Sequence, residues 1–251
     1  SERLFRQHCK PLHGFTLVEL LVVMGIIVLL MAIGVPSVTA LMNSGKLSNT
    51  RQAVASAVAA ARAVAVDESV PASGDAAFAG AAVVVKPRLN ADGDLVAADL
   101  VVAAHDDEDG SNNPIYEASS RVTTLSLVTG TMAVGVFRKD TGDGSELNLL
   151  TPPFAIRFDA EGVLVTTDPD ASGHQAVRYD LDGNDAISGS EVLPSAIGVI
   201  VFELDDLADA GYSISEAQTL DGADDTAGAW VRDNGIHLMF NRYSGTVLNE
   251  P

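Results

Sequence analysis

The sequence predicts an α+β protein in which one long N-terminal helix precedes a β-rich globular domain. Two observations support this. Residues 15–35 form an almost uninterrupted apolar run that continues into an alanine-rich stretch with helical spacing. After residue 74, short β-branched runs alternate with Asp, Gly and Asn turns. We therefore expect four segments, a basic leader, a membrane half of the helix, an amphipathic half and a globular domain, at residues 1–14, 15–36, 37–69 and 74–251.

The apolar run at residues 15–35 predicts a single transmembrane helix. At about 1.5 Å of rise per residue, a helix of this length spans roughly 31 Å, close to the thickness of a bilayer core. Residues 1–13 carry three basic side chains against one acidic side chain. Because positive charge is retained in the cytoplasm, we expect the N-terminus inside and the remainder outside.

The helical pattern continues from Ser37 to about Glu68. Alanine, arginine and glutamine dominate this stretch and favour helix. Pro36 lies inside the pattern and is expected to kink or locally break the helix without ending it. Apolar residues at spacings of three and four predict a buried stripe formed by Val38, Leu41, Gly45, Val54, Val58, Ala61 and Ala65.

The remainder of the chain reads as strands separated by acidic turns. Turn clusters such as "NADGD", "DTGDG" and "DAEG" separate the apolar runs. The candidate strands are residues 81–86, 98–104, 121–129, 132–137, 154–158, 162–167, 197–204, 235–240 and 245–248.

Charge and composition exclude several classes of function. The chain carries 15 basic and 34 acidic residues, a net charge of −19, and without residues 1–14 the charge becomes −21. Such a surface disfavours nucleic acid as a partner. The single cysteine, Cys9, leaves the exported part without a disulfide. No zinc-ligand spacing, nucleophile elbow or phosphate-binding loop is present, so we do not expect an enzyme.

The stretch "GFTLVE" places an acid, Glu19, near the start of the apolar run. A charged residue there is costly and suggests a function. Together with the basic residues before it, the stretch resembles the class III leader of type IV pilins and of the pseudopilins of type II secretion. This resemblance implies cleavage between Gly14 and Phe15 by a prepilin peptidase, followed by N-methylation of Phe15. Pro36 matches the proline that this family places late in the membrane half of its helix.

The resemblance also implies a role for Glu19. In the family this carboxylate is understood to pair with the N-terminal amine of a neighbouring subunit, which fixes the axial register of assembly. The expected partners are the membrane, prepilin peptidase, other pilins or pseudopilins and an inner-membrane assembly platform. The expected location is the bacterial inner membrane, with a cytoplasmic N-terminus and a periplasmic globular domain, from which a periplasmic or extracellular filament assembles.

Within the family, three stretches are loosely similar to the GspH/FimT-type minor subunits. These are the helix end at residues 60–72, a strand–turn–strand at residues 152–165 and a closing strand at residues 240–248. The acidic insertions and the length of the chain depart from that group. A secretion pseudopilus and a type IV pilus therefore both remain open.

Two other interpretations of the N-terminus remain. A secretory signal would be cut after Ala40, but its apolar region should be shorter and should not contain Glu19. A plain uncleaved anchor would let Glu19 reach the headgroups. The chain begins with Ser1 rather than Met, so the length of the leader stays open.

Residues 180–191, "DLDGNDAISGSE", have the ligand spacing of a twelve-residue calcium loop. One departure is Asp185 at position 6, where such loops use Gly. The alternative is an acidic, solvated turn with no metal. No other cofactor is expected. The candidate ligands at positions 1, 3, 5, 7, 9 and 12 are Asp180, Asp182, Asn184, the carbonyl of Ala186, Ser188 and Glu191.

The sequence therefore predicts a minor pilin or pseudopilin that is processed by prepilin peptidase and assembles into a filament. Two alternatives remain. One is a calcium-dependent binding module displayed on a filament, and the other is an exported β-domain on a plain single-pass anchor.

Overall fold

The computed structural model describes residues 16–67, 80–108, 114–140, 145–165, 177–182, 191–214, 219–220 and 226–248. The chain divides into two compact units, Ser1–Gly45 and Lys46–Pro251. Helix α1, Leu17–Asp67, begins in the first unit and ends in the second. The helix continues through Pro36, so the proline does not end it, as predicted, and the local break that was the alternative to a kink is absent there.

In the first unit, the large apolar side chains from Leu17 to Met31 are exposed, by 45% to 80%. Among the described residues, no helix meets the length and hydropathy required of a membrane-crossing segment.

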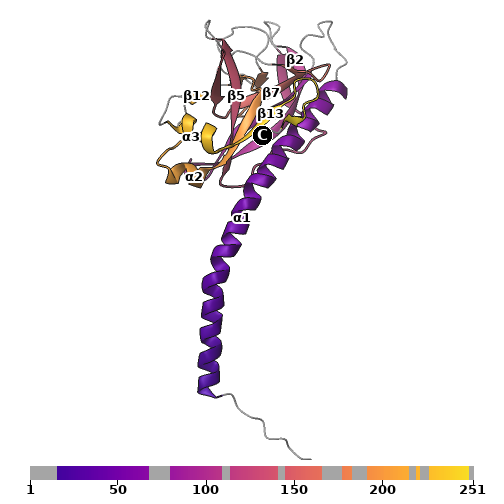
Figure 1. The fold of residues 1–251 in the computed structure, drawn as a ribbon. Coiled ribbons are helices and arrows are strands. Elements are labelled where there is room, and N and C mark those ends of the chain that lie inside the picture. Colours follow the sequence, from indigo (N-terminus) through magenta and orange to yellow (C-terminus); the bar gives the residue numbers. More distant parts are fainter. Residues whose placement is uncertain are drawn as a thin grey trace, which may run out of the picture. The chain divides into compact units, whose positions relative to one another are not determined.

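The second unit contains two sheets, shown with α1 in Figure 1. Among the described residues, sheet A has eight strands in the order β10-β9-β3-β2-β1-β7-β8, with β4 paired to β2. All its pairs are antiparallel except β3 with β9. Its strands are β1 Gly80–Leu89, β2 Leu95–Glu108, β3 Pro114–Ala118, β4 Leu125–Ser126, β7 Phe154–Asp159, β8 Leu164–Val165, β9 Val177–Tyr179 and β10 Val192–Leu193.

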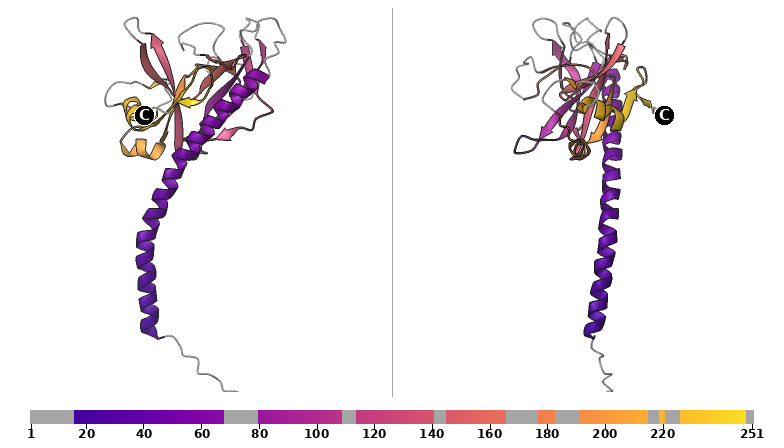
Figure 2. Two further views of the ribbon diagram at one scale, coloured as in Figure 1. Left: turned by 45° about the vertical axis from the view of Figure 1, so that its right-hand side comes forward. Right: turned by 60° about the vertical axis from the view of Figure 1, so that its left-hand side comes forward.

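Sheet B has six strands among the described residues, in the order β12-β6-β5-β11-β13-β14, all antiparallel. Figure 2 shows both sheets from two further sides. The strands of sheet B are β5 Thr131–Asp140, β6 Ser145–Leu150, β11 Gly198–Glu203, β12 Thr219–Leu220, β13 Ile236–Phe240 and β14 Val247–Leu248.

The first part of β1 is buried on both faces of sheet A, which explains why residues 80–85 read as a continuous apolar run. Along β1, Ala81, Val83 and Val85 enter a large core shared with α1 and sheet B. The alternate residues Ala82 and Val84 face a smaller core on the other side. The period-two alternation of a strand thus supplies two cores from one stretch of sequence.

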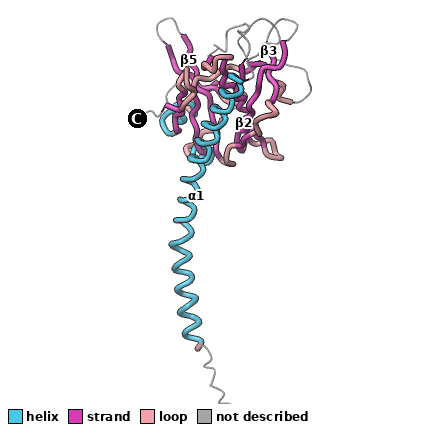
Figure 3. The backbone as a smooth tube through the Cα atoms, turned by 90° about the vertical axis from the view of Figure 1, so that its right-hand side faces the viewer, coloured by secondary structure: helices cyan, strands magenta, loops and turns pink. Residues whose placement is uncertain are grey.

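The part of α1 that follows Lys46 runs alongside the strands, as Figure 3 shows, and its small and branched side chains pack against them. Of the predicted stripe, Val54, Val58, Ala61 and Ala65 are buried, with at most 2% of each side chain exposed. Ala57 is buried beside them. The predicted helical stripe is therefore confirmed over these residues, while the side chains of Val38 and Leu41 lie outside the described part of the chain.

The sequence patterns did not predict two short helices, α2 Leu204–Asp209 and α3 Ala227–Asn234. Thr226 caps the start of helix α3, and its hydroxyl accepts the backbone N–H of Ala229 at 3.2 Å. Trp230 of α3 packs edge-on against Phe202 with ring centroids 6.2 Å apart. Strands β3, β6, β10 and β12 were also missed.

The predicted strand at residues 121–129 is wrong over most of its length. Only Leu125–Ser126 pair, with β2. Just before them the backbone turns, because the Ser119 side chain accepts the N–H of Arg121 at 3.3 Å and the Ser119 carbonyl accepts the N–H of Val122 at 3.4 Å. The β-branched residues there favoured a strand, but this local turn takes precedence.

Candidate functional site

The start of α1 is closed by a reciprocal pair of side chains. The Thr16 hydroxyl accepts the backbone N–H of Glu19 at 3.3 Å. In return, a Glu19 carboxylate oxygen accepts the backbone N–H and the hydroxyl of Thr16, each at 3.0 Å. This is a capping box, in which two otherwise unpaired backbone donors at a helix start are satisfied.

The sequence interpretation of Glu19 did not include this capping role. The signal was present as "TLVE", a threonine followed three residues later by glutamate. The carboxylate also lies at the positive end of the helix dipole, which favours a negative charge. Gly14 and Phe15, the predicted cleavage and methylation residues, lie outside the described residues, and so does the side chain of Pro36.

Comparison with known families decides what this N-terminus is. A family model described as the prokaryotic N-terminal methylation motif matches residues 11–35. The chain carries this methylation motif. It is the signature of type IV pilins and pseudopilins. The matched residues include Gly14, Phe15 and Glu19 and stop one residue before Pro36.

The methylation motif covers only the N-terminal part of the chain. No curated protein and no solved structure matches the chain. The β-rich domain must therefore be understood from its own residues, and the resemblance of three stretches to GspH/FimT-type subunits is not confirmed.

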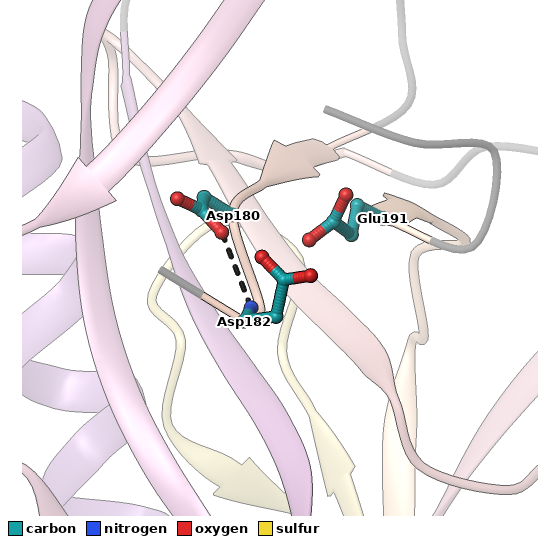
Figure 4. Close-up of side chains that lie close together, drawn as sticks. All are labelled: Asp180, Asp182 and Glu191. Atoms are coloured by element: carbon teal, nitrogen blue, oxygen red, sulfur yellow. Dashed lines mark hydrogen bonds between the residues drawn. The ribbon is translucent and has the colours of Figure 1, made fainter. Parts of the chain in front are cut away.

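The second candidate site is the end of the β9–β10 hairpin in sheet A. Val192 and Leu193 of β10 pair with Arg178 and Val177 of β9, which brings the two ends of the acidic loop together. Three carboxylates of the predicted calcium loop meet there, those of Asp180, Asp182 and Glu191 (Figure 4). One ligand oxygen from each lies within 4.8 Å of the other two.

Backbone hydrogen bonds hold this carboxylate cluster, defined as Asp180, Asp182 and Glu191. Asp180 Oδ1 accepts the N–H of Asp182 at 3.1 Å, and Glu191 Oε1 accepts the N–H of Leu181 at 2.9 Å. Glu191 is only 3% exposed. Burying a carboxylate is costly, and gathering like charges adds repulsion, so a divalent cation would stabilise this arrangement.

The cluster supplies the hard oxygen donors that calcium prefers. The other predicted ligands, Asn184, Ala186 and Ser188, lie outside the described residues. Helices flank the twelve-residue loop in an EF-hand, whereas here strands β9 and β10 flank it. The structure therefore brings together the first, third and twelfth predicted positions, but it does so on a hairpin.

A buried polar group lies on the second face of sheet A, where Tyr116 of β3 pairs with Tyr179 of β9, the residue before Asp180. Arg157 of β7 is 1% exposed, and its guanidinium carbon lies 6.0 Å from the ring centroid of Tyr116. His105 meets the same ring edge-on, with centroids 6.0 Å apart. A cation over an aromatic face is attracted to it, and the attraction strengthens when water is excluded. We interpret this group as structural.

Proposed function

We propose that this chain is a structural subunit of a type IV pilus or a type II secretion pseudopilus, processed by prepilin peptidase. The observation that carries the proposal is the methylation motif at residues 11–35. The exposed apolar side chains from Leu17 to Met31 support it, since such a surface needs lipid or neighbouring helices to cover it.

In this proposal the first half of α1 is held in the inner membrane with its N-terminus in the cytoplasm. Cleavage after Gly14 would expose a new amine at Phe15, four residues before Glu19. The carboxylate that closes its own helix in the single chain would then meet the amine of a neighbouring subunit. The β-rich domain would lie outside the membrane and decorate the filament, in the position of a minor subunit.

The test is the N-terminus of the protein recovered from its native membrane, measured by intact and peptide mass spectrometry. We expect a chain that starts at Phe15 and carries one added methyl group. A chain that keeps residues 1–14 would leave a plain anchor and overturn the proposal. A chain that starts at Leu41 would instead identify a secreted domain.

A second candidate function is calcium binding at the β9–β10 hairpin, favoured by the meeting of three carboxylates and by the burial of Glu191. Such a site would either stabilise the domain or make recognition by the displayed domain calcium-dependent. The affinity expected of an extracellular module is in the range of about 10⁻⁴ to 10⁻³ M.

Calcium binding is tested by the unfolding temperature of the full chain in detergent, with calcium and with a chelator. At a calcium concentration about 100 times the Kd, linkage predicts a stabilisation of about 2.7 kcal/mol. Asp182→Asn and Glu191→Gln should each remove most of the shift. Asp92→Asn, in the exposed turn at residues 90–94, is the matched control and should leave the shift intact. If calcium did not raise the unfolding temperature of the wild type, the site would be excluded. The same would follow if Asp92→Asn lost the calcium effect as fully as Asp182→Asn and Glu191→Gln.

A further inference from the structure

Arg62 of α1 contacts two turns that lie far apart in the sequence. Its Nε donates to the carbonyl oxygen of Gly162 at 3.1 Å, and its Nη2 donates to the carbonyl oxygen of Tyr243 at 3.1 Å. Gly162 lies in the turn between β7 and β8 of sheet A, and Tyr243 lies in the turn between β13 and β14 of sheet B. One helix side chain therefore binds a turn from each sheet.

Both turns are shaped by their own side chains. Asp159 Oδ1 accepts two backbone N–H groups at 2.9 and 3.0 Å in the first turn. Asn241 Oδ1 accepts two at 2.9 and 3.0 Å in the second. These side-chain turns fix the local bend without Arg62. Arg62 therefore attaches turns that are already formed.

Two glycines make room for the Arg62 stem. Gly162 has φ +72°, and a Cβ there would lie 2.8 Å from Val66 Cγ2 and 3.3 Å from Arg62 Cγ. Gly245 has φ +64°, and a Cβ there would lie 2.9 Å from Arg62 Cδ. At both positions, glycine provides a backbone conformation that other residues rarely adopt and a close approach to the helix.

The two turns also contact each other, because the N–H of Leu164 donates to the carbonyl oxygen of Arg242 at 2.8 Å. Helix α1, sheet A and sheet B thus meet at one point, which we call the Arg62 joint: Arg62, Gly162, Tyr243 and Gly245. A guanidinium presents several donors in fixed directions, so it can bind two carbonyls at once, whereas an ammonium is a compact point charge.

We propose that the Arg62 joint is a conformational lock that couples the β7–β8 turn to the β13–β14 turn through the helix. When Arg62 leaves, both turns detach from the helix together, each keeping its own bend, while the strands of the core remain folded. In this proposal Arg62 acts as a positioning residue that makes the two sheets respond as one body on α1. The proposal does not depend on the filament function, since it concerns the isolated chain.

The test is hydrogen–deuterium exchange of the full chain in detergent, read from peptides covering residues 159–165 and 241–248. In Arg62→Ala we expect exchange in both turns to rise at least tenfold, with residues 80–104 of β1 and β2 unchanged. Arg62→Lys keeps the charge and most of the stem, and should protect at most one turn. Arg51→Ala, on the exposed face of the same helix, is the control and should change neither turn.

A second variant tests the coupling itself. Gly162→Ala should push against Val66 and Arg62 and raise exchange at residues 241–248, a turn to which Gly162 does not belong. Gly211→Ala is the matched control, because Gly211 also has a positive φ, +86°, but has no atom within 4 Å of an added Cβ. In an Arg62→Ala background, Gly162→Ala should add nothing at residues 241–248.

Three results would overturn the proposal. The first is that hydrogen–deuterium exchange rises in only one of the two turns in Arg62→Ala. The second is an equal rise in residues 80–104, which would make Arg62 a general stabiliser of the domain. The third is an effect of Gly162→Ala confined to its own turn.

Discussion

At the residue scale, Tyr116 shows two opposing effects on one side chain. Burial raises the pKa of its phenol above the ordinary value of 10.0, while the nearby positive charge of Arg157 acts to lower it. Burial is the larger effect. Because the folded-state pKa lies above the unfolded value, the neutral phenol stabilises the fold below about pH 10, and this contribution is lost as the pH rises further.

Tyr116→Phe should therefore change the alkaline limb of the stability profile. At pH 8 the variant should be about as stable as the wild type, since the buried Tyr116 hydroxyl has no hydrogen-bond partner among the described residues. Above pH 10 the wild type should lose up to about 1.4 kcal/mol per pH unit through this group, so the variant should become increasingly more stable than the wild type. Urea unfolding of the full chain between pH 8 and 11.5 measures the stability difference at pH 8 and its change above pH 10.

The control for this prediction is Tyr243→Phe, because Tyr243 is 71% exposed and contacts Arg62 only through its backbone carbonyl. Its profile should run parallel to that of the wild type. If the stability profile of Tyr116→Phe also ran parallel to that of the wild type, the Tyr116 phenol would not contribute to the loss of stability at alkaline pH.

At the element scale, the capping box at the start of α1 gives Glu19 two separable tasks. As a cap it needs only a side-chain acceptor for the Thr16 N–H, which glutamine also supplies. As the proposed partner of a neighbouring amine it needs a negative charge. Substitutions at the two ends of the box therefore distinguish the tasks.

Glu19→Gln should keep the helix start but lose assembly, because the neutral amide cannot neutralise a charge in a low-dielectric setting. Thr16→Ala removes the cap oxygen, at a cost of about 1 kcal/mol in helix stability, but keeps the carboxylate, so it should still assemble. The measurement is the share of the subunit recovered in sheared filament fractions, with N-terminal processing checked in each variant.

The two variants must be compared in the native host at equal membrane abundance. If Thr16→Ala lost assembly as completely as Glu19→Gln, the carboxylate would act through the helix cap. If Glu19→Gln assembled normally, the charge would have no part in assembly.

The elements also show where sequence patterns succeed. The hairpin at residues 154–165 follows directly from alternation and an acidic turn, since Phe154, Ile156 and Phe158 face the large core and Asp159 closes the turn. The burial of Arg157 between them was not predictable from its residue type, because arginine is almost never fully buried unless it is paired. Its surroundings on the second face of sheet A come from strands distant in sequence.

At the scale of the whole molecule, the order of strands could not be predicted from the sequence. Local patterns gave most of the longer strands, but β3 joins β9 in parallel across more than 60 residues, a pairing that no local signal encodes. Two-residue strands such as β8 and β10 form only because neighbours pair with them. Tertiary context decides such elements, and it decides α2 and α3 as well.

The candidate sites were predictable to different degrees. Ligand spacing alone placed Asp180, Asp182 and Glu191 together, and the structure brings these three together on a strand hairpin. The motif at the N-terminus was predictable because it is a contiguous string of residues. The Arg62 joint was not, because Arg62 lies 100 residues from Gly162 and 181 residues from Tyr243, and they meet only when both sheets pack on one helix.

The outward side of α1 has a practical use. Ser56, Ala59 and Ala63 are exposed on the helix side that faces away from the core, and Cys9 is the single cysteine of the chain. A subunit cut after Gly14 would contain no thiol. Ala59→Cys or Ala63→Cys would then give one reactive position for a fluorophore or spin label, on a rigid helix and clear of both candidate sites. Each subunit could be followed individually without first removing a native cysteine.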